Sequence, residues 1–259
     1  MSLDHADIAA QLVEARRTKT PIEPLSDTYS DISPADSYAI QQAIVQTMLD
    51  GGDEIIGYKL GLTSRPMQQL LGLDQPDYSA VLGSMVYGEG ADIVAADYIQ
   101  PRAEAEIAVI LGSALKGPGV TVEDARSAAS GASAAVEIVD SRIVDWRIKL
   151  PDTIADLASC GAIVVSSDVV PIDHFELRLT GMVFRHNDEI VATGAGAAAL
   201  DDPLLAVAWA ANTLGALGIT LQAGHVVMTG SLHAAVDIAS GDTFRADFDR
   251  LGTVAAQVV

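Results

Sequence analysis

The feature that most constrains the fold is a change in the pattern of the sequence near residue 53. From there onward, short apolar and β-branched runs alternate with Gly, Pro and Asp, which is typical of strands separated by turns. We predict strands at 55–59, 107–111, 135–139, 162–165, 226–228, 235–238 and 243–248, and a hairpin of 177–185 with 189–193 around a turn at 186–188. Helices are predicted among them at 122–131 and 203–217. Because strands and helices do not alternate regularly, the sequence predicts an α+β fold rather than a Rossmann sheet.

Two helices are predicted before this point. Asp4 can cap the first helix, and Ser33 can cap the second, with Pro34 at its first position. Apolar residues recur every three or four positions in both segments, which favours helices with one buried face. The sequence therefore predicts a helical N-terminal segment at 1–52 and a β-rich domain at 53–259.

The composition excludes several classes of protein. An apolar fraction of 49% in 259 residues is enough to bury a sizeable core, which excludes a disordered chain. The formal net charge of −20 argues against a nucleic-acid partner, because phosphate binding relies on clustered Lys and Arg. An acidic protein of this kind can still bind an anion where a metal ion or a single basic residue reverses the local charge.

The chain also lacks the sequence signals of membrane and secreted proteins. The longest apolar stretch, 204–219, is interrupted by polar residues and glycines, so we expect a buried helix and no membrane partner. The first residues lack the basic patch and apolar core of a secretory signal, and Cys160 is the only cysteine. A disulfide within the chain is impossible, and a cytoplasmic location is expected.

Two glutamates stand two positions apart in the segment 101–109 (PRAEAEIAV). Side chains alternate along a strand, so Glu104 and Glu106 point to the same face, with Cα atoms about 7 Å apart. One interpretation is a solvated strand face, which is the common origin of an isolated Glu-x-Glu. The other is that both carboxylates converge on one cation.

Two observations favour a cation site. Apolar residues follow Glu106 directly, and Glu137 lies within another apolar run, 134–139 (AAVEIV). A glutamate in such a run is unfavourable to bury unless it is paired or bound to a metal. Three oxygen ligands without His or Cys suit Mg²⁺ or Mn²⁺. Asp140 would point to the opposite face from Glu137, so we interpret it as structural.

Lys59 and Asp77 are the candidates for proton transfer. Lys59 lies among Ile, Tyr and Leu between two glycines, where it is either a surface lysine with a buried stem or a desolvated lysine of lowered pKa. Asp77 follows Pro76, and a plain turn residue is the alternative interpretation. Ser159 could equally be a hydroxyl cap, and we interpret Cys160 as a small core residue.

Several motifs together resemble a known family. The order and spacing of these motifs are more specific than any one of them, and the match runs along nearly the whole chain. They are residues 57–64 (GYKLGLTS), 75–78 (QPDY), 100–106 (QPRAEAE), 136–143 (VEIVDSRI), 152–156 (DTIAD) and 228–231 (MTGS). The sequence resembles the 2-keto-4-pentenoate (2-hydroxypentadienoate) hydratases and the related 4-oxalocrotonate decarboxylases of the fumarylacetoacetase-like superfamily.

The resemblance implies roles for individual residues. Glu104, Glu106 and Glu137 would hold Mg²⁺ or Mn²⁺, and Lys59 and Asp77 would act as acid and base. Contacts with the substrate are implied in addition for Ser159, Leu60 and Ser231.

The resemblance also implies a fold and an assembly. The fold would be a fumarylacetoacetase-like mixed β-sheet roll with peripheral helices and a helical N-terminal segment. The chain would form homo-oligomers, of pentameric or decameric size, and could associate with sister enzymes of its pathway. It would act on a small 2-keto or 2-enol acid.

Hydration of 2-hydroxypenta-2,4-dienoate is the predicted reaction. The segments 152–156 and 158–161 favour the hydratases, whereas 194–198 (GAGAA) favours decarboxylation of 4-oxalocrotonate. A non-catalytic partner subunit is a third hypothesis, because two positions depart from the family pattern. Leu157 stands where Asn is common, and Asp202 stands where His is common.

Overall fold

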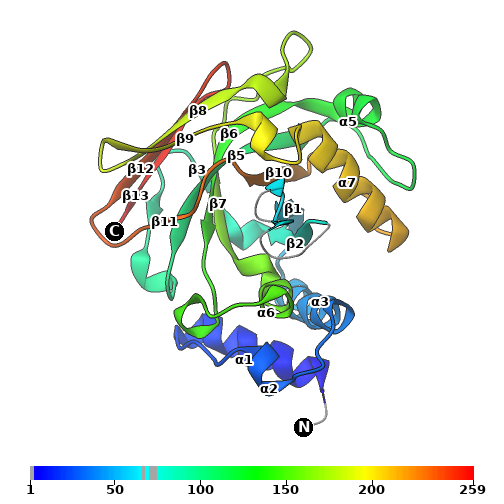
Figure 1. Ribbon diagram of the computed structural model, residues 1–259, viewed down its shortest axis with the longest axis vertical. Coiled ribbons are helices and arrows are strands. Elements are labelled where there is room, and N and C mark those ends of the chain that lie inside the picture. Colours follow the sequence, from blue (N-terminus) through cyan, green and yellow to red (C-terminus); the bar gives the residue numbers. More distant parts are fainter. Residues whose placement is uncertain (1–2, 66–67, 70–74) are drawn as a thin grey trace.

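The computed structural model describes residues 3–65, 68–69 and 75–259, and it contains two β-sheets with helices around them (Figure 1). The helices are α1 (His5–Thr18), α2 (Leu25–Thr28), α3 (Pro34–Asp50), α5 (Val122–Ala128), α6 (Leu150–Ala155) and α7 (Pro203–Ala216). The strands are β1 (Ile55–Gly61), β2 (Asp77–Leu82), β3 (Val86–Gly88), β4 (Asp92–Ile93), β5 (Arg102–Leu111), β6 (Ala129–Val139), β7 (Cys160–Val165), β8 (Gly181–His186), β9 (Glu189–Ala195), β10 (Val226–Ser231), β11 (Val236–Asp237), β12 (Thr243–Phe248) and β13 (Gly252–Val258).

The larger sheet has parallel and antiparallel pairs and carries the site described below. Its strand order is β2-β1-β10-β5-β6-β7-β3, with β11 also paired to β5. The smaller sheet has the order β4-β13-β12-β8-β9. The mixed sheets, with helices at the periphery and at the N-terminus, confirm the predicted α+β fold of the fumarylacetoacetase-like type.

Two hydrophobic cores lie on opposite faces of the larger sheet. Odd-numbered residues of β5, such as Ile107 and Val109, join the core shared with the smaller sheet and α7. Ala108 of β5 and Ala135 of β6 join the second core, which is shared with the N-terminal helices. Since side chains alternate along a strand, Glu104 and Glu106 share the face of Ala108, on the side of the N-terminal helices.

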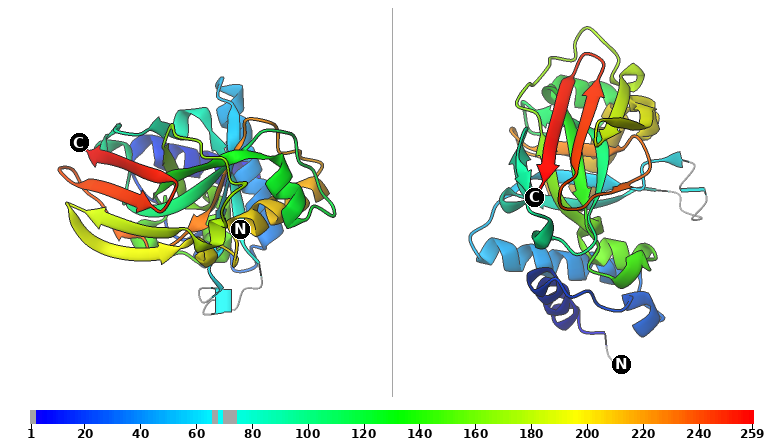
Figure 2. Two further views of the ribbon diagram at one scale, coloured as in Figure 1. Left: turned by 90° about the horizontal axis from the view of Figure 1, so that it is seen from above. Right: turned by 90° about the vertical axis from the view of Figure 1, so that its left-hand side faces the viewer.

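The N-terminal helices begin where the sequence predicts. The Asp4 carboxylate accepts hydrogen bonds from the Ala6 and Asp7 amides, and Ser33 forms a capping box with Asp36. Helix α3 packs against both α1 and α6, at the lower end of the molecule in Figure 1 and in the side view of Figure 2. The helical N-terminal segment is thereby confirmed.

The hairpin of β8 and β9 is also confirmed, with a turn at Asn187 and Asp188. Both residues have positive φ values, 51° and 65°, which is typical of a two-residue hairpin turn. The first predicted strand of this hairpin began too early, because residues 177–179 form a 3-10 turn.

The helix predicted at 122–131 ends at Ala128, and β6 begins at Ala129. Pairing with β5 extends along the whole of β6, which outweighs the weak strand preference of its Ala, Ser and Gly residues. The stretch 204–219 lies largely in α7, whose inner face is buried, as predicted, while Leu205 and Leu217 are exposed. Among the described residues, the helices are all too short or too polar to cross a lipid bilayer.

Candidate metal centre and active site

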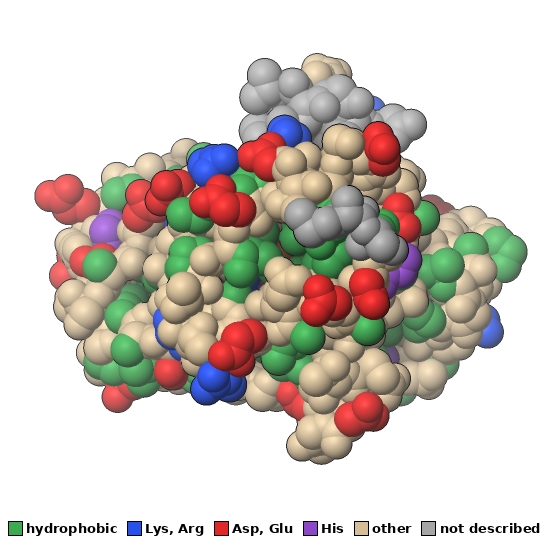
Figure 3. All heavy atoms as spheres, turned by 90° about the horizontal axis from the view of Figure 1, so that it is seen from below, with side chains coloured by type: hydrophobic (Ala, Val, Ile, Leu, Met, Phe, Trp, Pro, Cys, Tyr) green, Lys and Arg blue, Asp and Glu red, His purple; other side chains and the backbone are tan. Residues whose placement is uncertain are grey.

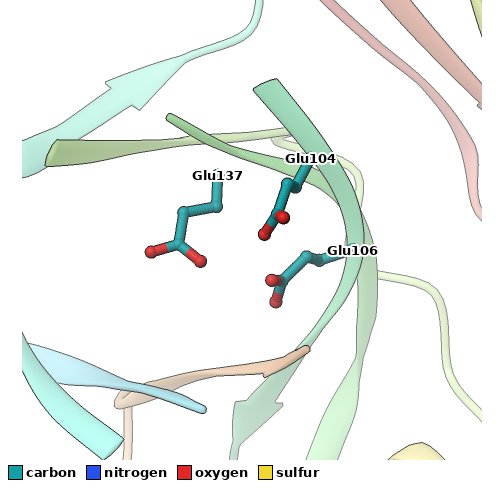
Figure 4. A group of neighbouring side chains, drawn as sticks. All are labelled: Glu104, Glu106 and Glu137. Atoms are coloured by element: carbon teal, nitrogen blue, oxygen red, sulfur yellow. The ribbon is translucent and has the colours of Figure 1, made fainter. Parts of the chain in front are cut away.

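Three buried or half-buried carboxylates meet on one face of the larger sheet. Glu104 and Glu106 lie on β5, and Glu137 lies on the adjacent antiparallel strand β6, directly opposite Glu104. One carboxylate oxygen from each side chain lies within 4.8 Å of the other two. Figure 4 shows the three carboxyl groups turned toward one another. The grouping predicted from the sequence is therefore present.

The surroundings of these carboxylates fit a bound cation. Glu106 and Glu137 are each 1% exposed, and neither oxygen of Glu137 has a hydrogen-bond partner among the described residues. Burial, followed by the charge of Glu137, raises the pKa of Glu104 to about 7. Burial and the charges of Glu137 and Glu104 also raise the pKa of Glu106 well above its ordinary range. Buried carboxylates that repel one another and accept few hydrogen bonds from the protein are suited to bind a hard divalent cation.

Lys59 is buried beside this group, on β1. Its Nζ lies 3.3 Å from Oε1 of Glu137, and its side chain is 4% exposed, so it is not a surface lysine. Burial alone would lower the pKa of Lys59, but the charges of Glu137, Asp77 and other acidic groups outweigh it, and the pKa is raised. The expectation of a lowered pKa was therefore wrong, because carboxylates surround the ammonium group.

Asp77 faces the same group from β2. It pairs with Gly61 of β1, is 2% exposed, and its Oδ1 has no hydrogen-bond partner among the described residues. Burial raises the pKa of Asp77, and the charge of Lys59 opposes that rise. A Cβ at position 61 would lie 2.2 Å from Oδ1 of Asp77, so glycine is required there. The plain turn interpretation does not explain a buried, unpartnered carboxylate.

The motif at 228–231 contributes a backbone donor that sequence reasoning missed. The Gly230 amide donates a hydrogen bond of 2.9 Å to Oε2 of Glu106. Gly230 has a φ of +106°, and a Cβ there would collide with Thr63. The glycine at position 230 was the signal in the sequence that could have indicated this donor. Ser231 is adjacent to Glu106 across the strands, and its hydroxyl donates to the carbonyl of His233 at 2.6 Å.

Ser159 lies in a backbone conformation that is costly for residues other than glycine. Leu157, Ala158 and Ser159 have φ values of 55°, 48° and 57°. The Ser159 hydroxyl lies 3.2 Å from that of Thr153, and the residue is 4% exposed. Such strain is frequent at functional sites, where the surrounding structure holds it in place.

The side chains of Leu60 and Cys160 lie in the two hydrophobic cores. The Leu60 side chain joins the core shared with the smaller sheet, on the opposite side of β1 from Lys59. Its contact with a substrate remains a prediction. Cys160 is fully buried, as expected of a core residue. Burial raises the pKa of its thiol, and the charge of Glu137 adds to that rise.

Asp140 and the two unusual positions have structural roles. The Asp140 carboxylate accepts hydrogen bonds from the Ile99 and Gln100 amides, which confirms its structural interpretation. Asp202 caps α7 by accepting from the Leu204 amide at 2.9 Å. Leu157 is 2% exposed and belongs to the core beneath the N-terminal helices.

Comparisons with known proteins agree with this geometry. A family model described as fumarylacetoacetate (FAA) hydrolase C-terminal matches residues 59–259. The 2-hydroxyhexa-2,4-dienoate hydratase of Comamonas testosteroni is 41% identical over 249 residues, which cover 95% of this chain and 94% of that protein. The 2-keto-4-pentenoate hydratase of Burkholderia vietnamiensis is 41% identical over 251 residues, covering 97% of this chain and 96% of that protein.

A solved structure is similar over the same extent. The 4-oxalocrotonate decarboxylase from Pseudomonas putida G7, complexed with magnesium and adipate, has a TM-score of 0.95 and 30% sequence identity, and the match covers 98% of this chain and 97% of that chain. The mixed sheet and its carboxylate cluster define an enzyme of the fumarylacetoacetase-like class. The chain belongs to the fumarylacetoacetate hydrolase family.

Proposed function

We propose that this chain is a divalent-metal-dependent hydratase, a hydro-lyase that adds water to 2-hydroxypenta-2,4-dienoate (2-keto-4-pentenoate) and yields 4-hydroxy-2-oxopentanoate. The reaction belongs to the breakdown of aromatic compounds. One observation carries the proposal: three carboxylates converge beside a buried lysine, in a chain that is 41% identical over nearly its whole length to two hydratases.

Glu104, Glu106 and Glu137 would hold Mg²⁺ or Mn²⁺. Carboxylate oxygens are the ligands that both ions prefer, and the similar decarboxylase is complexed with magnesium. When bound, such an ion supplies a Lewis acid that polarises the 2-oxo or 2-enol oxygen and the neighbouring carboxylate of the substrate. The oxygens of Glu137, which accept no hydrogen bond from the described residues, support this assignment.

Lys59 and Asp77 would move the protons. The enol proton leaves the oxygen on C2 while C5 gains a proton, which gives an α,β-unsaturated ketone. Water then adds its oxygen at C4, and a proton is placed on C3, so atoms and charge balance. Both residues are buried next to the carboxylates, where bulk water does not compete for these transfers. Which of the two serves each carbon is open to mutagenesis.

Ser159, Ser231 and Leu60 would contact the substrate. The Ser159 hydroxyl is held by Thr153, which supports a fixed donor, and Ser231 stands opposite Glu106. Because the Leu60 side chain lies in the core, its contact would be made by the backbone.

A paired assay tests the reaction. Purified protein is given 2-hydroxypenta-2,4-dienoate and, separately, 4-oxalocrotonate, each with Mn²⁺ or with EDTA. We expect loss of the dienol absorbance and formation of 4-hydroxy-2-oxopentanoate with the first substrate, only when metal is present. Undiminished turnover in EDTA would refute the metal-dependent scheme.

Decarboxylation of 4-oxalocrotonate is the second candidate. The observation that favours it is the TM-score of 0.95 to the 4-oxalocrotonate decarboxylase. That protein is complexed with adipate, which is a six-carbon dicarboxylate like 4-oxalocrotonate. Release of CO₂ without hydration would establish this reaction instead. The third hypothesis, a non-catalytic partner subunit, requires loss of the metal ligands, and Glu104, Glu106, Glu137 and Lys59 are all retained.

The cellular setting is proposed from the sequence and the resemblance. We expect a cytoplasmic homo-oligomer, pentameric or decameric, able to associate with sister enzymes of its pathway. Residues 1–52 would form a separate helical segment on the catalytic domain at 53–259. Light scattering of the purified protein measures the number of subunits, and a monomer would contradict the assembly.

A further inference from the structure

A cavity lies beside the N-terminal helices, and none of the three carboxylates Glu104, Glu106 and Glu137 lines it. It has a volume of about 330 Å³. Its apolar wall consists of Leu12 and Val13 of α1, Ile44 and Met48 of α3, and Leu157. This volume lies at the lower end of the range for ligand pockets, about 300–1,000 Å³. The cavity is therefore large enough for a small organic molecule.

Four basic side chains also line this cavity, although two of them are already neutralised. Arg142 is paired with Asp156, and Arg17 is paired with Glu14. Basic residues are scarce in a chain with 15 Lys and Arg against 35 Asp and Glu. Figure 3 shows acidic side chains spread over this end of the molecule. The cavity thus concentrates positive charge within an acidic surface.

The other two basic residues, Arg16 and Lys19, have no carboxylate partner among the described residues. Lys19 Nζ donates to the Arg16 carbonyl at 2.7 Å, and Arg16 Nη2 donates to the Gly161 carbonyl at 3.3 Å. Arg16 Nη1 is buried and has no acceptor in the described part of the chain. Burial lowers the pKa of Arg16, and the charge of Arg142 lowers it further. A desolvated guanidinium with a free donor is unfavourable unless an anion binds it.

We propose that this cavity binds a small amphipathic carboxylate, with its carboxylate on Arg16 and its apolar body against α1, α3 and Leu157. The charges of Arg16 and Lys19, which have no carboxylate partner in the described part of the chain, select an anion, and the apolar wall selects a hydrocarbon body. The proposal does not rest on the reaction proposed above, because the two sites share no residue.

Calorimetric titration of the full-length protein with hexanoate tests the proposal, first with Mg²⁺ and then after EDTA. We expect one hexanoate per chain in both conditions. Butanoate, which has two fewer methylenes, should bind about fifteenfold more weakly, because each buried methylene contributes about fourfold. Hexan-1-ol lacks the charge and should bind at least about tenfold more weakly than hexanoate.

Two adjacent arginines on α1 give a matched pair of variants. Arg16→Met should weaken hexanoate binding at least about tenfold, whereas Arg17→Met should change it less than about twofold, since Glu14 already neutralises Arg17. Val13→Glu places a carboxylate one turn from Arg16 and should abolish binding even if Arg16→Met folds poorly.

Three results would overturn the proposal. These are equal binding of hexan-1-ol and hexanoate, loss of hexanoate binding in EDTA, and unchanged affinity in Arg16→Met. If the subunit number of Arg16→Met also changes while its affinity does not, the basic residues would be assigned to contact with an acidic protein surface. Failure of the hydratase assay while hexanoate still binds would count against the proposed reaction alone.

Discussion

Two clusters of buried charge in this protein are built in opposite ways. Arg142 and Asp156 are 2% and 1% exposed as side chains, and the Asp156 carboxylate accepts from both the backbone amide and the side chain of Arg142. The Arg142 guanidinium also donates to the carbonyls of Asp140, Asp156 and Cys160. Glu137 is equally buried, yet both of its oxygens lack a hydrogen-bond donor among the described residues.

The difference separates a structural charge from a functional one. Burying a charge costs several kcal/mol, and a protein recovers that cost only by pairing and hydrogen bonding. In the Arg142 cluster, groups of the protein itself supply this pairing and hydrogen bonding, so no external ion is required. The carboxylate cluster has three acids and one buried lysine, so the lysine alone cannot balance the three acids once they are ionised, and an external cation can. Unsatisfied buried acceptors are therefore the better guide to the site.

The largest effect is expected from Glu106→Gln. The amide keeps the shape of the side chain and can still accept from the Gly230 amide, but it removes one negative ligand. We expect metal-dependent turnover to fall about 10³-fold or more, since the ion stabilises transition-state charge by several kcal/mol. Circular dichroism and thermal unfolding in EDTA should show an intact fold with unchanged or higher stability. A variant that retains full turnover would remove the carboxylates from the reaction.

Asp156→Asn is expected to lower stability, in contrast to Glu106→Gln. This variant leaves Arg142 buried without a counter-charge, so the free energy of unfolding should fall by about 3–5 kcal/mol, as measured with urea. Asp27→Asn is the control, because exposed Asp27 also binds basic side chains, and its loss should cost no more than about 1 kcal/mol. Equal losses of unfolding free energy in both variants would contradict the distinction between the two clusters.

The same distinction explains what sequence could predict. Glu104, Glu106 and Glu137 were found because acidic residues in apolar strand runs are locally anomalous, and strand alternation determines the face on which they lie. The Gly230 amide donor and the strained turn at Leu157–Ser159 depend on loop geometry, which leaves no periodic signal.

The boundary between α5 and β6 was mispredicted for a related reason. Ala, Ser and Gly have little strand preference, so long-range pairing with β5 decides their conformation. Desolvation was one of two interpretations of Lys59 and is the one that the structure bears out, but the direction of its pKa shift depends on three neighbouring carboxylates and a thiol that only the fold brings together. Local patterns thus located the residues, while the charge balance required the three-dimensional arrangement.

Metal binding provides the next test. Mg²⁺ at 100 times its Kd should stabilise the protein by about 2.7 kcal/mol. Burial, followed by the charge of Glu137, raises the pKa of Glu104 to about 7, so below pH 7 this ligand carries a proton that the metal must displace. The Kd should therefore be about tenfold weaker at pH 6 than at pH 8.

Calorimetry in two buffers of different ionisation enthalpy measures the accompanying proton release. Release should be larger at pH 6 than at pH 8, because Glu104 loses its proton between these values, and Glu106, whose pKa is also raised, adds to the release. Glu104→Gln serves as the control, since it removes both a ligand and the titrating group. Metal binding that does not vary with pH would contradict the charge state inferred for the cluster.

The smallest effect concerns Gln41 of α3. Its buried side chain is polar but uncharged, unlike the side chains of the two charged clusters. Its Nε2 donates to the carbonyl of Tyr78 at 3.0 Å and to that of Ile154 at 2.7 Å, which ties the N-terminal segment to the strand of Asp77. Gln41→Leu leaves two buried acceptors without a donor, so the free energy of unfolding should fall by about 1–3 kcal/mol. Gln46→Leu is the matched control, because the exposed Gln46 side chain donates only to Asp50 of the same helix in the described part of the chain, and its loss should cost less than about 0.5 kcal/mol.

Urea unfolding of these two variants also tests the proposed division at residue 52. If α3 is coupled to the sheet through Gln41, the wild-type protein should unfold in one transition, and Gln41→Leu should either shift that transition or split it in two. Turnover should fall with stability in Gln41→Leu, because Tyr78 follows Asp77 directly along β2. An unshifted single transition in Gln41→Leu would show that the helical segment is held to the catalytic domain by its apolar contacts alone.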